Sequence, residues 1–366
     1  MEATTKTSQR NYGIDLLRLV AAFYVIILHS MYQGGLFLST TPGTYQNYIC
    51  KVLLIFSFCA VNIFGIVSGY VGYRETEKRF SFTGYLSLWI DVVFYGVILT
   101  LLFMYLRPGT VTVYNMIDMF YPITKNQYWY FSAYSMVYFL TPFLNRMIRH
   151  SSEKELKYLF FLIVFIIVPL EFIGRSFSMS QGYSSLWLIL LYLIGAIMKK
   201  TGIGSGIRPV TAIFSILLLN ICLFFLNKSH PGISILNIYF DFTFEYNATY
   251  VSPFFLASAI LHVILFSKLR VNTPAKKLIA FAAPAAFAVY IVNVQESVWL
   301  YFMKDRFVSW VSYTPVMIVL HTVCFSFLFV LSVVLADFCR RKLFRFLKIY
   351  GLLEKLESIF QKAAIG

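Results

Sequence analysis

Ten long apolar stretches constrain this chain more than any other feature. Each is close to the length of about 20 residues that a helix needs to cross the hydrocarbon core of a bilayer. A chain in which 59% of 366 residues are hydrophobic and 13% are charged cannot bury so much apolar side chain within a water-soluble fold. The sequence therefore predicts an all-α, polytopic membrane helix bundle of about ten transmembrane helices, at approximately 13–31, 52–73, 85–106, 128–148, 157–174, 184–198, 210–227, 250–267, 279–302 and 315–338.

The basic residues between these stretches predict the orientation of the bundle. With the N-terminus placed in the cytoplasm, most of the 31 Lys and Arg fall in cytoplasmic segments, as the positive-inside rule requires. An even number of spans then puts both termini in the cytoplasm. Because the charge lies in short loops between apolar stretches, the net charge of +15 indicates membrane topology and argues against nucleic-acid binding.

The sequence predicts one integral-membrane domain, over residues 1–339, and a cytoplasmic amphipathic helix at 340–366. In the second segment Leu347, Leu353 and Leu356 recur at helical spacing among Lys and Arg, which is typical of a helix lying on the anionic cytoplasmic leaflet. The five cysteines show neither a CxxC motif nor metal-ligand spacing, so neither a metal nor a bound cofactor is expected.

Arg18 and His29 are the strongest candidates for a functional site. They lie eleven residues apart in the first apolar stretch, which corresponds to three helical turns, so both side chains point the same way about 16 Å apart. Ionisable groups inside a membrane are costly and generally mark a working site. Arg18 would lie near one membrane face and His29 near the other, which suggests chemistry with components on both sides of a bilayer.

Each of these two residues has more than one interpretation. His29 can act as a general base if a hydroxyl reaches it, and Glu171 or Glu296 could serve as an acid or orient the imidazole. Arg18 can hold an anionic ligand or pair with Asp15 one turn earlier, and the two roles are compatible.

Two further motifs come from small and aromatic residues. Ser68, Gly69 and Tyr70 close the second apolar stretch, where small residues permit close helix approach or a break in the helix. Trp129 begins the fourth stretch among several aromatic residues. We interpret these as an aromatic belt at the membrane interface, with a stacking surface for a sugar as the alternative.

These residues resemble the motifs of acyltransferase family 3, bacterial integral-membrane O-acyltransferases of surface polysaccharide and cell wall. The spacing of Asp15, Arg18 and His29 is similar to the family's first-helix signature. Similar stretches follow at 61–70 (VNIFGIVSGY), 128–144 (YWYFSAYSMVYFLTPFL), 192–196 (YLIGA) and 287–291 (FAVYI). The resemblance covers the chain from residue 11 to about residue 300.

The resemblance implies a function and assigns roles to particular residues. It implies transfer of an acyl group, in the simplest case acetyl, from cytoplasmic acyl-CoA to a carbohydrate hydroxyl outside the cytoplasm. His29 would be the catalytic residue, assisted by Arg18, and Arg18 with Lys78 and Arg79 would bind the donor. Where many members have a histidine in a late helix, this chain has Asn293, which forms hydrogen bonds but does not titrate near neutral pH.

The expected partners are therefore acyl-CoA as co-substrate, a surface polysaccharide or lipid-linked sugar as acceptor, and the lipid bilayer of a bacterial cell membrane. Two rival interpretations remain. A transporter or flippase of lipid-linked saccharide would also explain many spans with buried charge, but such proteins often contain repeated halves, and the sequence shows none. A non-catalytic sugar sensor is the second rival.

Overall fold

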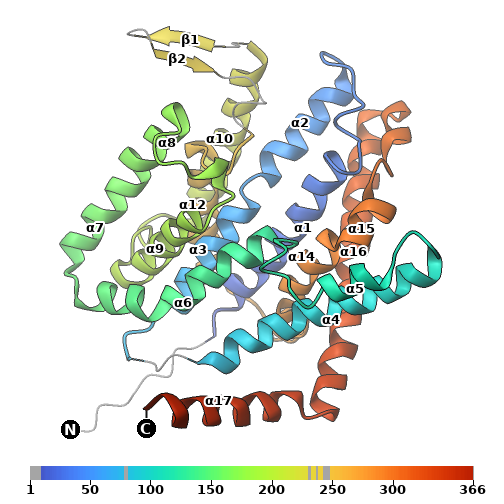
Figure 1. Ribbon diagram of the computed structural model, residues 1–366. Helices are drawn as coiled ribbons and strands as arrows, with labels where there is room; N and C mark the ends of the chain where they lie inside the picture. Colours follow the sequence, from blue (N-terminus) through green and yellow to red (C-terminus); the bar gives the residue numbers. More distant parts are fainter. Residues whose placement is uncertain (1–9, 78–80, 230–231, 236–237, 242–247, 366) are drawn as a thin grey trace.

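The computed structural model describes residues 10–77, 81–229, 232–235, 238–241 and 248–365, and they form a helical bundle (Figure 1). Within these residues, seven segments are long and apolar enough to cross a membrane. They are Tyr12–Met31 (α1), Tyr45–Gly72 (α2 and α3), Phe82–Leu106 (α4), Glu153–Gly174 (α7, η1 and α8), Pro209–Asn227 (in α10), Thr273–Val294 (α13, η3 and α14) and Pro315–Phe346 (α16).

Three of these segments are interrupted helices. The first is divided into α2 (Tyr45–Ser57) and α3 (Ala60–Gly72), and the second into α7 (Glu153–Phe161), the π-helix η1 (Leu162–Ile167) and α8 (Val168–Gly174). The third consists of α13 (Thr273–Ala282), the 3-10 turn η3 (Ala283–Ala285) and α14 (Ala286–Val294).

The other predicted spans are also helical, but they are shorter or more polar. They are α6 (Trp129–His150), α9 (Ser185–Thr201) and α12 (Pro253–Ser267). The multi-pass helical membrane fold is confirmed, whereas crossing by ten helices stays a prediction.

Short elements connect the bundle. A two-stranded antiparallel hairpin of β1 (Gly232–Ile235) and β2 (Ile238–Asp241) follows α10 (Pro209–Ser229) and is the one departure from the predicted all-α class among the described residues. The remaining short elements are α5 (Val113–Asp118), η2 (Ser180–Gly182), α15 (Glu296–Val298), η4 (Trp299–Met303) and η5 (Val308–Ser312).

Glycines bring α3 and α9 into close contact, as the Ser68–Gly69 motif predicts. A Cβ atom at Gly69 would lie 1.9 Å from the carbonyl oxygen of Tyr192, and one at Gly195 would lie 1.8 Å from that of Ile66. Any larger residue would force the two backbones apart. The crossing fixes α3, which carries Ser68 along one wall of the site described below.

The ninth predicted span ends earlier than expected. The helix stops at Val294, because Gln295 adopts a non-helical conformation with φ −59° and ψ 132°. Its side chain accepts a hydrogen bond from the Val298 N–H at 3.0 Å and donates one to Thr100 Oγ1 at 3.0 Å. The break is therefore held by α4, and it leaves Glu296 exposed instead of inside a span.

The C-terminal amphipathic helix begins later than residue 340, and the division into a membrane domain and a cytoplasmic helix stays a prediction. Helix α16 continues to Phe346, and α17 (Ile349–Ile365) begins after Lys348, whose φ of 54° turns the chain. Arg340 is not part of the amphipathic helix: it is buried and binds Asp91 and Asp337, linking α4 to α16. Arg341 joins the same cluster through Asp337 at 2.8 Å.

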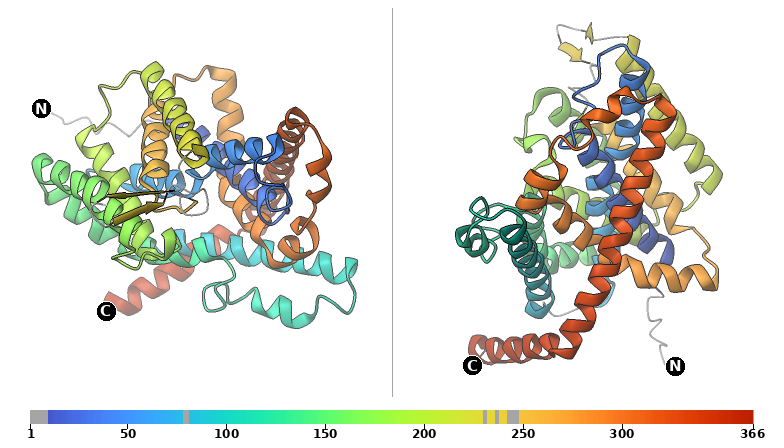
Figure 2. Two further views of the ribbon diagram at one scale, coloured as in Figure 1. Left: turned by 90° about the horizontal axis from the view of Figure 1, so that it is seen from above. Right: turned by 90° about the vertical axis from the view of Figure 1, so that its right-hand side faces the viewer.

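Helix α17 lies across the end of the bundle at which α1 begins (Figures 1 and 2). Glu357 holds it there by accepting hydrogen bonds from the backbone N–H groups of Phe82 and Thr83 and from the Thr83 hydroxyl. Leu352 and Leu356 remain exposed on α17, as expected of a helix that rests on a lipid surface.

Candidate functional site

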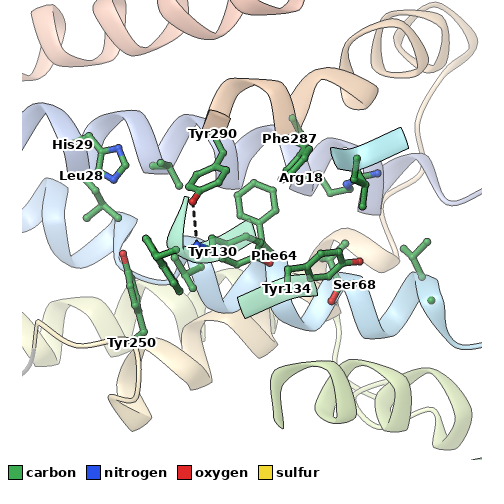
Figure 3. A pocket seen from close by; sticks show the side chains of 18 residues that line it. Arg18, Leu28, His29, Phe64, Ser68, Tyr130, Tyr134, Tyr250, Phe287 and Tyr290 are labelled. Atoms are coloured by element: carbon green, nitrogen blue, oxygen red, sulfur yellow. Dashed lines mark hydrogen bonds between the residues drawn. The ribbon is translucent and has the colours of Figure 1, made fainter. Parts of the chain in front are cut away.

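Helix α1 places Arg18 and His29 on one cavity, as their helical spacing predicts. This central cavity has a volume of about 260 Å³ and is also lined by Ser68, Tyr130 and Tyr290. Figure 3 shows Arg18 toward one end of the row of side chains and His29 toward the other, both on the same helix. The N-terminus of α1 is fixed by Asn11, which caps the helix through the Ile14 N–H and donates to the Ser267 carbonyl of α12.

His29 is held by α14 and by the segment after its break. Its Nδ1 forms a hydrogen bond with Oδ1 of Asn293, and its ring meets Trp299 edge-on with centroids 4.8 Å apart. An amide oxygen only accepts, so this bond requires the imidazole proton on Nδ1. Nε2 then carries the lone pair, which is the arrangement of a general base.

Tyrosines form the wall between the two ends of the central cavity. The hydroxyl of Tyr290 accepts a hydrogen bond from the backbone N–H of Tyr130 at 3.1 Å, which joins α14 to the start of α6. Tyr130 in turn stacks on Tyr134 with ring centroids 6.1 Å apart. These contacts hold the first turns of α6 against the helix that carries Asn293.

Arg18 is available to a ligand. Its salt bridge to Asp15 is long, at 4.0 Å, whereas Asp15 contacts Arg10 at 2.5 Å. The side chain is 37% exposed and lines the central cavity, so a structural pair and a ligand role are both compatible with the geometry. Asp91 of α4 is bound to Arg340.

A second cavity, which we call the basic cavity, adjoins the central one. It measures about 290 Å³, is lined by Arg74, Arg149 and Glu77, and shares Val71 and Gly72 with the central cavity. Arg149 and Glu77 form a salt bridge at 3.5 Å, which leaves the lining with one more positive than negative charge.

A third cavity, which we call the aromatic cavity, lies at the His29 end. It measures about 640 Å³ and shares His29, Trp129 and Tyr250 with the central cavity. Its remaining lining includes aromatic and polar side chains: Tyr32, Tyr183, Trp299, Asp118, Lys125, Gln127 and Glu296. His29 therefore lies where two cavities meet, with Arg18 and the basic cavity on one side and the aromatic cavity on the other.

The two acidic residues proposed to orient His29 have different positions. Glu296 lines the aromatic cavity together with His29. Glu171 is buried and accepts hydrogen bonds from the backbone N–H groups of Phe177 and Met179, at 2.7 and 2.9 Å, so it stabilises the turn after α8. It lines neither cavity that contains His29.

The aromatic residues at the start of α6 do not form an interfacial belt. Tyr128 is buried, and Trp129 faces both the central and the aromatic cavities. The belt interpretation is wrong here because Tyr183 and Tyr250, from the segments before α9 and α12, and Tyr290 of α14 contact the side chains that a belt would expose. Of the donor-binding residues expected from the sequence, Lys78 and Arg79 lie outside the described residues.

Asn293 is the site residue whose role sequence reasoning missed. It lies 264 positions from His29, so nothing in local periodicity connects the two. The available signal was a polar residue inside an apolar helix, one turn after Tyr290 on the same face. Tyr130 and Tyr290 were missed for a similar reason, since buried tyrosines are common in aromatic-rich membrane helices.

Comparison with known families decides the assignment. The sequence model described as an acyltransferase domain matches residues 11–348, nearly the whole chain. The chain belongs to acyltransferase family 3. No curated protein and no solved structure matches it. Membership of this family makes the protein a multi-pass membrane acyltransferase. The matched residues include His29 and the other residues that line the central cavity.

Proposed function

We propose that this protein transfers an acyl group, in the simplest case acetyl, from cytoplasmic acyl-CoA to a hydroxyl of an extracytoplasmic polysaccharide or lipid-linked sugar in a bacterial cell membrane. The observation that carries the proposal is the position of His29 between two cavities of different character. An enzyme that joins substrates from opposite sides of a membrane needs one reactive group that both can reach.

The donor fits the side of Arg18. CoA carries several phosphate groups, and guanidinium groups bind phosphate through paired hydrogen bonds. Arg18, Arg74 and Arg149 line the adjoining central and basic cavities. The pantetheine arm would extend along α1 and bring the thioester carbonyl toward His29, over the distance of about 16 Å that eleven helical residues span.

The proposed reaction is a direct transfer. Nε2 of His29 accepts the proton of the acceptor hydroxyl as its oxygen attacks the thioester carbonyl. The carbon–sulfur bond then breaks, and the sulfur leaves as CoA thiol with the proton that His29 returns. In the alternative, His29 takes the acyl group first and passes it to the hydroxyl. Detection of an acyl adduct on His29 without acceptor would favour that second route.

The orientation follows from the same proposal. Both termini would lie in the cytoplasm, as the charge distribution predicts, and the start of α1 and helix α17 lie at one end of the bundle (Figure 1). The basic cavity would then open toward the cytoplasm, where acyl-CoA is made. A cysteine introduced in α17 at exposed Ser358, which lies on the side of the helix away from Leu352 and Leu356, should react with a membrane-impermeant thiol reagent only after the membrane is permeabilised.

The test of function is CoA release and ester formation by the purified protein in lipid nanodiscs, given acetyl-CoA and an acceptor glycan. His29→Ala should abolish both products. His321→Ala is the matched control, because this half-buried histidine on α16 contacts Trp310 and Tyr313 and lies outside the cavities described above. Equal activity of His29→Ala and wild type would refute the proposal.

The rival function, a flippase of lipid-linked saccharide, is not favoured, because membership of an acyltransferase family predicts bond formation and not translocation alone. It would gain support if the protein moved a lipid-linked saccharide between leaflets without releasing CoA.

A further inference from the structure

Three aromatic rings in mutual contact form a wall of the aromatic cavity. Trp129 and Tyr183 have ring centroids 4.6 Å apart, and Tyr183 and Tyr250 are separated by 5.0 Å. Trp129 also stacks on Tyr250, with a centroid distance of 6.1 Å and an interplanar angle of 19°. The rings come from the start of α6 and from the segments before α9 and α12, so packing fixes them relative to one another. A rigid aromatic wall binds a flat apolar face at a low cost in conformational entropy.

The polar groups in this cavity have a net negative charge. Asp118 and Lys125 neutralise each other in a salt bridge at 2.9 Å. Glu296 lines the same cavity and forms no salt bridge with any of the residues that the structure describes. One uncompensated carboxylate therefore faces whatever molecule approaches His29 from this side.

The two cavities on either side of His29 thus differ in the sign of their charge. Three arginines and Glu77 give the central and basic cavities together an excess of two positive charges, whereas the aromatic cavity has an excess of one carboxylate. A carboxylate accepts hydrogen bonds from hydroxyl groups and repels another anion at short range, and because Glu296 is exposed, water weakens this repulsion without removing it. This charge separation keeps an anionic donor on the Arg18 side.

We infer that the aromatic cavity is the acceptor subsite and that it takes an uncharged sugar and discriminates against acidic sugars such as uronates and sugar phosphates. The apolar face of a pyranose would lie on the wall formed by Trp129, Tyr183 and Tyr250. Its hydroxyl edge would reach His29 Nε2 for transfer and Glu296 for recognition. Glu296 is then a specificity-determining residue. The inference rests on the proposed function and adds the charge class of the acceptor.

Binding is the first measurement, because it does not depend on catalysis. Saturation-transfer NMR on the protein in nanodiscs would compare methyl glucoside, galactoside and mannoside with methyl glucuronide and galacturonide, which differ from the first two only in the oxidised C6 group. We expect saturation-transfer signals from the neutral glycosides and signals about tenfold weaker from the uronides. Trp129→Ala should abolish the signals of the neutral glycosides, and Trp129→Phe should retain them. Equal binding of both classes, or no binding of any neutral glycoside, would overturn the inference.

The matched pair for charge is Glu296→Gln and Asp305→Asn. Both remove one carboxylate, but Asp305 lies on an exposed loop and lines none of the three cavities. Glu296→Gln should narrow the preference for neutral glycosides by about three- to tenfold, and Asp305→Asn should leave it unchanged. Equal effects of the two variants would mean that overall surface charge sets the preference and would refute a role for Glu296.

Acyl transfer by the same samples separates this inference from the proposed function. Neutral glycosides that bind but are never acylated with acetyl-CoA would refute the proposed function while leaving the binding class intact. Acylation of uronides at the rate of neutral glycosides would refute the inference while leaving the transferase function intact.

Discussion

Replacement of Asn293 tests whether its hydrogen bond sets the reactive form of His29. Asn293 has no exposed surface, so water cannot replace its amide oxygen as the partner of Nδ1. In Asn293→Leu, which is close in volume, the imidazole N–H would lose its partner. Leaving a buried donor without an acceptor costs about 1–3 kcal/mol, equivalent to a loss of about 5- to 150-fold in the rate of acyl transfer.

The control for Asn293→Leu is Asn293→Asp, which keeps the shape and the accepting oxygen. We expect the Leu variant to lose kcat with little change in KM for acyl-CoA, and the Asp variant to retain more activity than the Leu variant. Initial rates of ester formation in nanodiscs, with melting temperatures of all three proteins, provide the measurement. If Leu and Asp variants have the same kcat as wild type, Asn293 does not position His29.

Three further predictions concern stability. Gly195→Ala should lower the free energy of unfolding by about 1–3 kcal/mol in a denaturant titration, since its Cβ meets backbone, whereas Gly351→Ala, with nothing within 4 Å, should not destabilise. Arg340→Met should cost about 3–5 kcal/mol, because Asp91 would lose its cation and buried Asp337 would keep only Arg341, while Lys157→Met, which breaks an exposed pair, should cost under about 1 kcal/mol. Hydrogen bonds, first from Thr83, hold the pKa of Glu357 below its usual value. The stability that Glu357 contributes to the docking of α17 is therefore complete above the usual pKa of a glutamate and is lost as the pH falls through the lowered pKa. Glu357→Gln should thus speed hydrogen exchange in α17 at pH 7, with the difference from wild type vanishing in acid; a difference that persists in acid would contradict this.

The features predictable from the sequence were those within one helix. Arg18 and His29 lie on the same continuous α1, so the helical period alone places both on one cavity. Gly69 likewise indicated a close helix contact without naming the partner helix. These inferences needed no knowledge of the neighbouring helices, since side-chain direction is fixed by the backbone of a single element.

The features that could not be predicted depend on neighbouring helices. Trp129 was assigned to a belt because spacing shows which way a side chain points and not which helices cover it. The sequence places Arg340 in a surface helix, because its pairing with Asp91 and Asp337 depends on the packing of α4 against α16. The sequence does not predict the break at Gln295, because no proline or glycine marks it and the hydrogen bond with Thr100 comes from a distant helix.

The continuity of α1 also fixes the distance between the two ends of the central cavity. Because the helix is unbroken from Tyr12 to Met31, the separation of Arg18 from His29 is fixed by the rise of about 1.5 Å per residue and cannot adapt to the substrate. Under the proposed function, a donor bound by Arg18 at one end and by His29 at the other would be selected by the length of its arm, independently of the chemistry of its acyl group. One extra residue between Arg18 and His29 would increase their separation only slightly, but it would turn the imidazole by about 100° and point it away from the cavity.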